Sequence, residues 1–323
     1  MTSVLLSFAL VAAWGSWIPV AQAVPGLRQP TRTLYATAGN LVFAAIALVV
    51  GGSAGRLTLG WKEFWLPLAG GLVWTAGSVC AFRATELIGL ARASGTWTPL
   101  NIIVAFVCGA LLFGELSGFS AVRYALLAGC LALVLAGVFL IIGSQSSATA
   151  ESAADAAGGD PAPAPAPAPA ESRSAEARRA ADYRKGLLLA VGAGLLWGGY
   201  FVPAQWAHVP SQLGNFPLAV GMFAAAVVLA ARERAFVRLS PAHTVVQFGA
   251  GLLFGVGSVA LLDLVPRIGT GAGFTVAQLS LLVNAGVGIW VFRVPAPGSR
   301  PARFALAGIA LAGVGGTVIG ALR

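Results

Sequence analysis

The stretch Trp14-Gly15-Ser16-Trp17, followed by Ala21-Gln22, lies in an apolar run near residues 4–23 and has a counterpart in mid-chain. The counterpart is Trp197-Gly198-Gly199-Tyr200, followed by Ala204-Gln205, in another apolar run. Each run is long enough to cross the roughly 30 Å hydrocarbon core of a bilayer as an α-helix. The stretch therefore predicts membrane-spanning helices and an internal duplication.

Similar apolar runs occur throughout the chain in two sets of five. The first set lies near 4–23, 33–52, 64–82, 91–113 and 122–142, and the second near 186–206, 213–231, 244–265, 270–292 and 303–321. We therefore expect an all-α integral membrane protein with ten transmembrane helices. The expected units are a first five-helix repeat at 1–144, an Ala/Pro-rich disordered linker at 145–183 and a second five-helix repeat at 184–323.

A second match supports the duplication. Gly71-Leu72 with Trp74 and Gly77-Ser78-Val79 corresponds to Gly251-Leu252 with Phe254 and Gly257-Ser258-Val259. Because each copy has an odd number of spans, the second copy must enter the membrane from the opposite side. The sequence therefore predicts two inverted repeats, a plan that in many transporters places a solute site near the midplane between them.

Composition excludes several other classes of protein. The chain is 58% hydrophobic and 10% charged, with a mean hydropathy of +0.84, and its net charge of +9 comes from Lys and Arg scattered between apolar runs. Scattered cations form no nucleic-acid-binding face. Cys80, Cys108 and Cys130 lie inside apolar runs, without the spacing of a disulfide framework or a metal site. The sequence also lacks a phosphate-binding loop and a Ser/His or paired-Asp constellation, so we expect no cofactor, no metal and no enzyme activity.

The N-terminal run ends in Ala21-Gln22-Ala23, which is similar to a signal-peptidase site. Lys and Arg do not precede this run, and its counterpart in mid-chain cannot be a signal peptide. We therefore expect this segment to remain as the first helix.

The motifs resemble a known family of membrane proteins. The duplication, the Trp-Gly pairs and Leu112-Phe113-Gly114-Glu115 resemble the drug/metabolite transporter superfamily, while Gly89-Leu90-Ala91-Arg92-Ala93 and Gly271-Ala272-Gly273-Phe274-Thr275 with Gln278 look most like its glucose/ribose porter group. The resemblance implies a secondary transporter of the inner cell membrane that moves a sugar or polyol by alternating access. Export of drugs, metabolites or amino acids stays open as an alternative. A non-transporting membrane scaffold is the alternative from another class.

Aromatic and amide side chains in the apolar runs are the candidates for solute binding. They are Trp14, Trp17, Trp97, Asn101, Trp197, Tyr200, Gln278 and Asn284. Aromatic faces suit the C–H surface of a sugar ring, and amides and indole N–H groups supply hydrogen bonds. Two other interpretations stay open: the aromatic residues can form an interfacial belt, and the amides can join helices to one another.

Two acids are candidates for coupling the solute to protons. Asp263 and Glu86 lie near helix ends, whereas Glu115 closes the fourth run and is better explained as a helix-end group. Pairing of Asp263 with Arg267 on one helix face is the structural alternative. The expected partners are thus a small solute, the bilayer and, as a candidate, protons. The sequence does not indicate an oligomeric state.

The flanking charges predict how the chain is oriented. Most of the Lys and Arg residues next to the predicted spans fall on the side of the linker. The positive-inside rule then places the linker in the cytoplasm and both termini outside.

Overall fold

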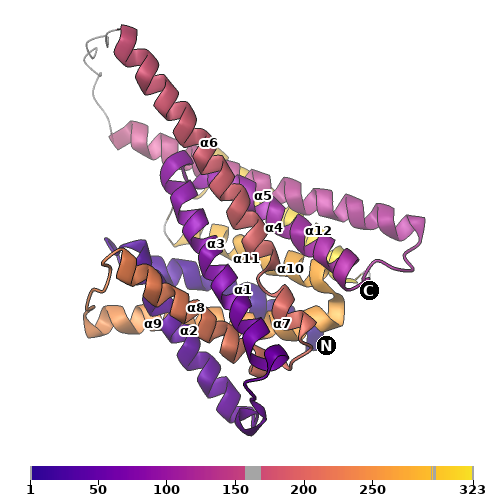
Figure 1. The fold of residues 1–323 in the computed structure, drawn as a ribbon. Helices are drawn as coiled ribbons and strands as arrows, with labels where there is room; N and C mark the ends of the chain where they lie inside the picture. Colours follow the sequence, from indigo (N-terminus) through magenta and orange to yellow (C-terminus); the bar gives the residue numbers. More distant parts are fainter. Residues whose placement is uncertain (1, 157–168, 292, 294–295, 322–323) are drawn as a thin grey trace.

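The computed structural model describes residues 2–156, 169–291, 293 and 296–321 and is built from helices in these ranges (Figure 1). The first half contains α1 (Thr2–Gln22), α2 (Gln29–Val50), α3 (Leu66–Ile88), α4 (Leu90–Leu112) and α5 (Ala121–Ala156). The second half contains α6 (Pro169–Gly199), α7 (Val202–Trp206), α8 (Ser211–Arg232), α9 (Pro241–Ile268), α10 (Thr270–Gln278), α11 (Ser280–Trp290) and α12 (Arg300–Ala321). The predicted all-helical class is confirmed for these residues.

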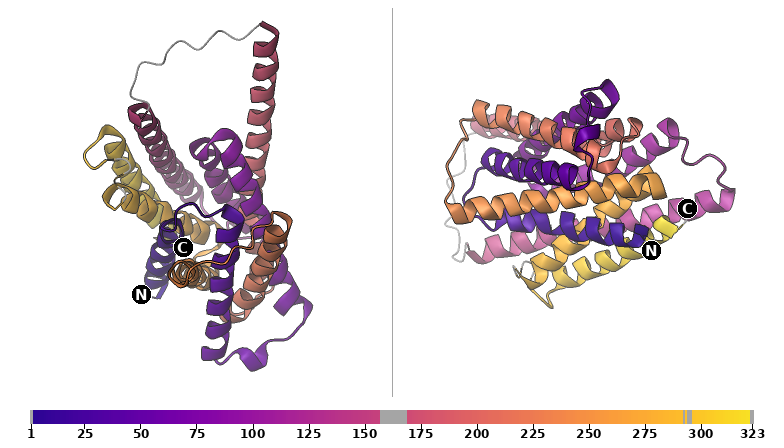
Figure 2. Two further views of the ribbon diagram at one scale, coloured as in Figure 1. Left: turned by 90° about the vertical axis from the view of Figure 1, so that its left-hand side faces the viewer. Right: turned by 90° about the horizontal axis from the view of Figure 1, so that it is seen from below.

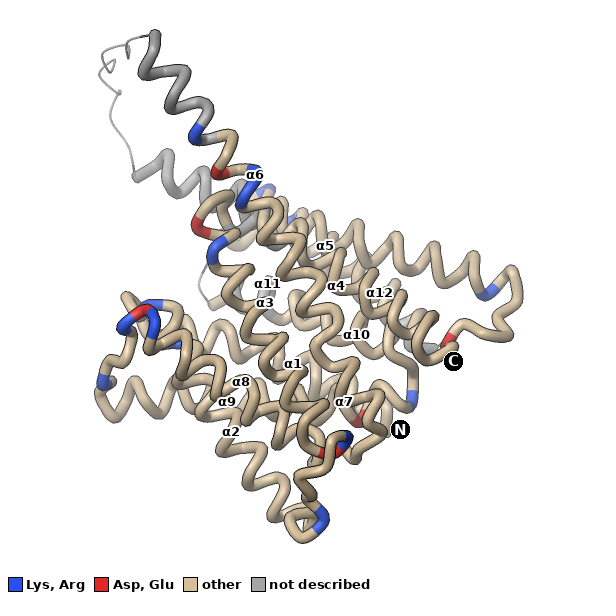
Figure 3. Tube along the Cα trace, in the orientation of Figure 1, with Lys and Arg blue, Asp and Glu red and all other residues tan. Residues whose placement is uncertain are grey.

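Nine helical segments in the described ranges are long and apolar enough to cross a membrane. Outside α6, charged residues lie at or near the ends of the helices and leave their middle parts free of charge (Figure 3), and in α6 the charged residues end at Lys185. The outward side chains in these middle parts are apolar, as at Phe8, which is 75% exposed, and Ile103, which is 43% exposed. Such surfaces suit lipid rather than water. The chain is a multi-pass membrane protein.

The region between the halves is more helical than its composition suggested. Helix α5 continues to Ala156 and α6 begins at Pro169, so helices cover parts of the stretch for which an extended linker is expected. Alanine, which has the highest helix propensity, is frequent in both extensions, and the start of α6 also contains glutamate and arginine, which favour helix as well. The first part of α6 extends beyond the remaining helices (Figure 1). Residues 157–168 lie outside the described residues, and the division at 145–183 stays a prediction.

Helices of the two halves pack against one another rather than forming separate bundles (Figure 2). Helix α1 packs on α9, α3 packs on α6 and α8, and α5 packs on α12. Glycines allow the closest approaches: a Cβ on Gly251 would lie 2.1 Å from the carbonyl oxygen of Ala36, and one on Gly71 would lie 2.1 Å from that of Leu218. Small residues at such crossings let two backbones touch, which is a common way to pack helices in lipid.

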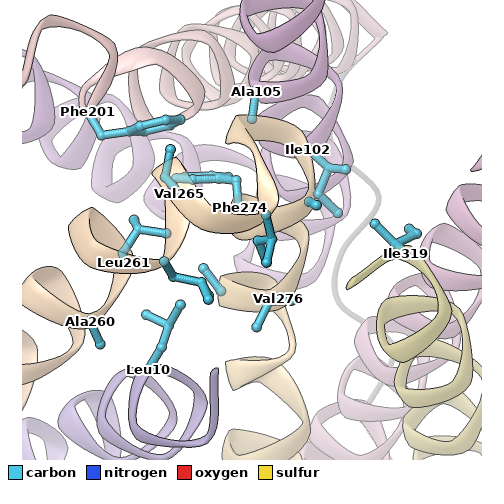
Figure 4. Packing of buried hydrophobic residues seen from close by; sticks show 14 of the residues in the cluster. Leu10, Ile102, Ala105, Phe201, Ala260, Leu261, Val265, Phe274, Val276 and Ile319 are labelled. Atoms are coloured by element: carbon cyan, nitrogen blue, oxygen red, sulfur yellow. The ribbon is translucent and has the colours of Figure 1, made fainter. Parts of the chain in front are cut away.

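The apolar core lies between the halves. Its buried members include Leu10 of α1, Ile102 of α4, Leu261 of α9 and Ile319 of α12, with Phe201 and Phe274 at its centre (Figure 4). The rings of Phe201 and Phe274 stack with centroids 4.8 Å apart. This core holds α1, α4, α9, α10 and α12 around the region where the candidate residues lie.

Two single-residue turns connect helix pairs in the same way. Gly89 joins α3 to α4 with φ of 81°, and Gly269 joins α9 to α10 with φ of 92°. A positive φ is easily adopted by glycine and rarely by other residues. The chain therefore reverses direction with one residue, and α4 and α10 begin directly beside the ends of α3 and α9.

Candidate functional site

Three tryptophans surround the ring of Phe254. The Trp14 ring stacks on Phe254 with centroids 5.6 Å apart and an interplanar angle of 10°, and Trp17 meets the same ring edge-on at 5.2 Å. The Trp74 ring lies at 5.1 Å. We call Trp14, Trp17, Trp74 and Phe254 the central aromatic cluster. It joins α1, α3 and α9 at one point.

The indole N–H groups of Trp14 and Trp197 already have acceptors. Trp14 Nε1 donates to the carbonyl oxygen of Phe254 at 3.2 Å, and Trp197 Nε1 donates to that of Trp74 at 3.0 Å. Each indole lies against a glycine, Gly257 beside Trp14 and Gly77 beside Trp197, where any Cβ would collide with the ring. In this conformation both tryptophans connect helices, and a solute would have to displace a main-chain acceptor to use their N–H groups.

A second aromatic pair lies next to a buried amide whose oxygen has no hydrogen-bond partner among the described atoms. The rings of Trp97 on α4 and Trp197 on α6 meet edge-to-face with centroids 5.6 Å apart. Asn101 follows Trp97 by one helical turn and is only 4% exposed. Its Oδ1 is buried without a hydrogen-bond partner among the described atoms. A buried amide oxygen that lacks a donor costs free energy unless a solute or water supplies one. We call Trp97, Asn101 and Trp197 the α4–α6 patch.

Tyr200 lies apart from the tryptophans. It is 3% exposed and meets Phe201 and Phe274 edge-on, with centroids 5.8 and 6.4 Å away. Tyr200 thus has its ring contacts with Phe201 and Phe274, whereas Trp17, which corresponds to it in the first half, has its ring contact with Phe254. The two aromatic pairs predicted from the sequence do not meet as one lining.

The predicted helix at 270–292 is broken next to Gln278. Helix α10 ends at Gln278 and α11 begins at Ser280, and the hydrogen bonds from Leu279 N to Val276 O and from Leu282 N to Leu279 O close tight turns across the break. Half-buried Gln278 therefore lies where the helix changes direction. Pro99 lies inside α4, which continues through it as one helix. Asn284 lies on α11, and its side chain is outside the part of the chain that the structure describes.

Other buried amides were missed by sequence reasoning. Asn215 on α8 is fully buried, and neither Nδ2 nor Oδ1 has a partner among the described atoms. Asn40 on α2 is also fully buried, with Nδ2 3.6 Å from Met222 Sδ and Oδ1 unpaired. Each is a lone amide in an apolar run, the same pattern that drew attention to Asn101. This pattern would have identified both residues.

Glu115 is a helix-end group, as the sequence predicts. Its carboxylate accepts from the main-chain N–H of Thr270 with distances of 2.6 and 2.8 Å to the two oxygens, and it also accepts from the Thr270 hydroxyl. The Gln205 amide donates to the same hydroxyl. The carboxylate therefore caps the first turn of α10, where negative charge is stabilised, and links the ends of α4, α7 and α10.

The two proton-coupling candidates have different surroundings. Glu86 lies 3.9 Å from Arg83, with its side chain 66% exposed. Asp263 is half-buried near the end of α9. The expected ion pair between Arg267 and the Asp263 carboxylate is not among the ion pairs of the described residues. Arg267 Nε instead donates to the main-chain oxygen of Asp263 at 3.1 Å.

Comparisons with known proteins agree with this architecture. A Listeria innocua protein named for sugar uptake is 22% identical over 320 residues, which cover 98% of this chain and 99% of that protein. Glucose uptake protein GlcU of Bacillus subtilis is 22% identical over 257 residues, 80% of this chain and 78% of its own length. A crystal structure with 18% identity superposes with a TM-score of 0.67 over 98% of this chain and 97% of the other, which shows a shared fold.

The family comparison covers both halves of the chain. The family described as sugar transport protein matches residues 5–159 and 168–322. This match confirms the resemblance to a group of sugar permeases that the motifs indicated. The chain belongs to the sugar transport protein family and is a membrane transporter rather than an enzyme.

Proposed function

We propose that this protein moves a sugar across the cell membrane by alternating access between two inverted halves. The observation that carries the proposal is the buried, unpartnered Oδ1 of Asn101 beside the paired rings of Trp97 and Trp197. Sugar hydroxyls donate hydrogen bonds, and sugar C–H faces pack on indole rings. The relatives named for sugar and glucose uptake favour a sugar over a drug or an amino acid as the solute.

Matched glycine contacts support the inverted repeat. Gly39 packs on the carbonyl oxygen of Phe248, and Gly221 packs on that of Leu68. Gly251 on Ala36 and Gly71 on Leu218 form a second matched pair of contacts. When the first half is aligned with the second, Gly39 corresponds to Gly221 and Leu68 to Phe248. Each contact therefore corresponds to the other contact of its pair. A pseudo-twofold axis between α2 and α8 explains both pairs with one operation.

Matched hydrogen bonds support the same axis. The bond from Trp14 to Phe254 and the bond from Trp197 to Trp74 connect residues that correspond in the sequence repeat. A chance similarity between glycine-rich helices would not be expected to preserve the donor, the main-chain acceptor and the facing glycine together. An inverted repeat of five helices also requires α12 to cross the membrane as the tenth span.

Movement of the halves would open the α4–α6 patch to either side in turn. The central aromatic cluster holds α1, α3 and α9 together, while the break at Leu279 and the turns at Gly89 and Gly269 interrupt regular helix hydrogen bonding. Interrupted helices are common near transporter sites, where they allow local movement and free main-chain groups. Gln278 at the break and Trp17 in the cluster are the other described residues that we assign to the solute path. Asn284 and Tyr200 remain candidates from the sequence.

Sugar binding by Asn101→Ala tests the proposal. Removing an amide that bonds the solute should weaken glucose binding by about 1 to 3 kcal/mol. The melting temperature should fall less than in the control below, because the lost Oδ1 has no hydrogen-bond partner among the described atoms. Gln247 offers a matched control, since its Nε2 donates to Ala21 O at 2.7 Å and joins α9 to α1. Gln247→Ala should lower the melting temperature and leave glucose affinity unchanged. An unchanged glucose affinity in Asn101→Ala would exclude Asn101 from the sugar site.

Asp263 is our proposal for proton coupling. Its carboxylate is half-buried and is not held by the expected arginine, whereas Glu86 is exposed and lies near Arg83. A charged carboxylate inside the membrane raises the free energy of the folded protein, and such residues commonly have a function. We therefore rank Asp263 ahead of Glu86. We also propose that the linker side faces the cytoplasm, following the excess of flanking Lys and Arg there.

A further inference from the structure

We propose that an open groove between α2, α8 and the beginning of α9 binds an anionic phospholipid from the linker-side leaflet. One acyl chain would lie in the groove, and the headgroup would lie on Arg234 and Arg238. This site is separate from the proposed sugar path. The proposal rests on the shape of the groove, on the way the segment after α8 is fixed, and on the surrounding charge.

The groove is apolar and rich in aromatic side chains. It has a volume of about 250 Å³ and includes Tyr35 of α2, Phe223 of α8, Phe248 of α9 and Phe236 of the connecting segment. Phe236 is 59% exposed although it belongs to this lining. A large apolar side chain at an open apolar groove indicates a hydrophobic occupant.

The segment that carries Phe236 is fixed along one face of α2. Thr31 Oγ1 donates to Ala235 O at 2.8 Å, and Tyr35 Oη donates to Val237 O at 3.0 Å. Thr31 and Tyr35 are one helical turn apart, so α2 binds alternate carbonyl oxygens of the segment. These bonds set the position of Phe236 between the two anchored carbonyls. The groove is therefore a built feature of the fold.

A defined cap begins this segment. The N–H of Ala235 donates to Ala230 O at 2.8 Å and the N–H of Arg234 donates to Ala231 O at 3.2 Å, which is the Schellman arrangement at a helix end. Arg234 occupies the position that usually carries glycine and has φ of 50°. The cap therefore fixes where the chain leaves α8, directly before the part of the segment that α2 binds.

Two arginines lie on either side of Phe236 in sequence. Arg234 and Arg238 are exposed, and neither forms an ion pair with another described residue. The nearby Arg28 and Arg83 differ, because both lie within 3.6 Å of the Glu233 carboxylate. Arg234 and Arg238 therefore have charge available for an external anion at the mouth of the groove.

The dimensions of the groove match one leaflet. Phe223 precedes the last residue of α8, Arg232, by nine positions, so the groove extends roughly 14 Å from the helix end along α8. Half of a hydrocarbon core is about 15 Å. A phospholipid presents its charge directly above its acyl chains, in the same order as the arginines and the apolar lining. If a second copy of this chain filled the groove, it would have to place an apolar ridge on the lining and an acidic side chain on the arginines at the same spacing.

Lipid binding can be measured without transport. The protein in detergent is mixed with phosphatidylglycerol or phosphatidylcholine, and bound lipid is counted by native mass spectrometry beside the melting temperature. We expect phosphatidylglycerol to be retained several-fold more than phosphatidylcholine. Arg234→Gln with Arg238→Gln should remove that preference. Arg300→Gln with Arg303→Gln is the matched control, because it removes two charges on the same side at the start of α12 and should leave the preference intact.

The apolar part of the site needs its own variant. Ala38 also lines the groove, and Ala38→Trp should fill it and reduce phosphatidylglycerol retention with every arginine present. Equal retention of the two lipids by the parent protein would overturn the proposal, as would an unchanged preference in the Arg234/Arg238 variant. Loss of a dimer in Ala38→Trp with unchanged lipid retention would assign the groove to a second copy and would also overturn it. The arginine variants keep the test valid if Ala38→Trp fails to fold, because both side chains are exposed.

Discussion

Asn40 of α2 and Met222 of α8 touch in the interior, with Nδ2 of the amide 3.6 Å from Sδ of the methionine. The two residues follow Gly39 and Gly221, which make matched contacts with Phe248 and Leu68. Asn40 and Met222 are therefore each other's counterparts in the proposed repeat. A pseudo-twofold axis of an inverted repeat would pass between them.

The glycine crossings give the first prediction. Gly251→Ala and Gly71→Ala each place a methyl group 2.1 Å from a main-chain oxygen, so two helices must separate. Each change should destabilise the protein by about 1 to 3 kcal/mol, seen as a lower melting temperature. Gly249→Ala is the control, since its Cβ meets no other atom within 4 Å and alanine favours helix by about 1 kcal/mol. Equal melting temperatures for all three variants would contradict the packing.

The two indole hydrogen bonds give the second prediction. Trp14→Phe and Trp197→Phe each remove one of two side-chain donors to a main-chain oxygen, which still accepts from Ser258 or Ser78, and each should cost about 1 kcal/mol. Trp290→Phe changes a side chain that is 61% exposed and should have little effect. Thermal unfolding in detergent measures all three. A large loss for only one of Trp14→Phe and Trp197→Phe would contradict equivalent roles in the repeat.

The helices and the family could be predicted from the sequence because both depend on long apolar runs and short motifs. Hydropathy located α1, α2 and α4 closely, since every main-chain group in lipid needs a partner inside its own helix. It placed the end of α3 at 82 instead of 88 and the end of α5 at 142 instead of 156, because the last turns of these helices are more polar. The break at Leu279 was missed because residues 270–292 form one long run without an internal proline.

The site was harder to predict because it depends on which helix faces touch. The repeat already matched Trp74 with Phe254, yet their position around Trp14 and Trp17 follows from the packing of α3 and α9 on α1 and α6. Tyr200 aligns with Trp17 but has different ring contacts. Equivalent positions in two copies need not have equivalent neighbours once the sequences of the copies diverge.

The cap on α10 gives the third prediction. Glu115→Ala removes the acceptor for Thr270 N–H and the negative charge at the start of α10, so it should lower stability by about 1 to 2 kcal/mol. Glu115→Gln keeps one acceptor oxygen and should lose less. Melting temperatures of the two variants decide the matter. If Glu115→Ala melts with the parent protein, the carboxylate does not hold α10.

Proton coupling gives the fourth prediction. Asp263→Asn keeps the size of the side chain and removes its ability to exchange a proton. Sugar-driven pH change inside proteoliposomes should disappear in this variant, while sugar binding in detergent is retained. Glu86→Gln is the comparison and should keep the pH change, because Glu86 is exposed beside Arg83. Unaltered proton movement in Asp263→Asn would exclude Asp263 from the coupling step.

Sugar counterflow in proteoliposomes tests transport itself. Vesicles loaded with unlabelled glucose are diluted into a trace of labelled glucose, and the label inside is followed with time. The parent protein should accumulate label transiently above the level of empty vesicles, and Asn101→Ala should accumulate several-fold less at the same amount of folded protein. Equal label in vesicles with and without the folded protein, repeated over other hexoses, pentoses and polyols, would contradict a sugar permease.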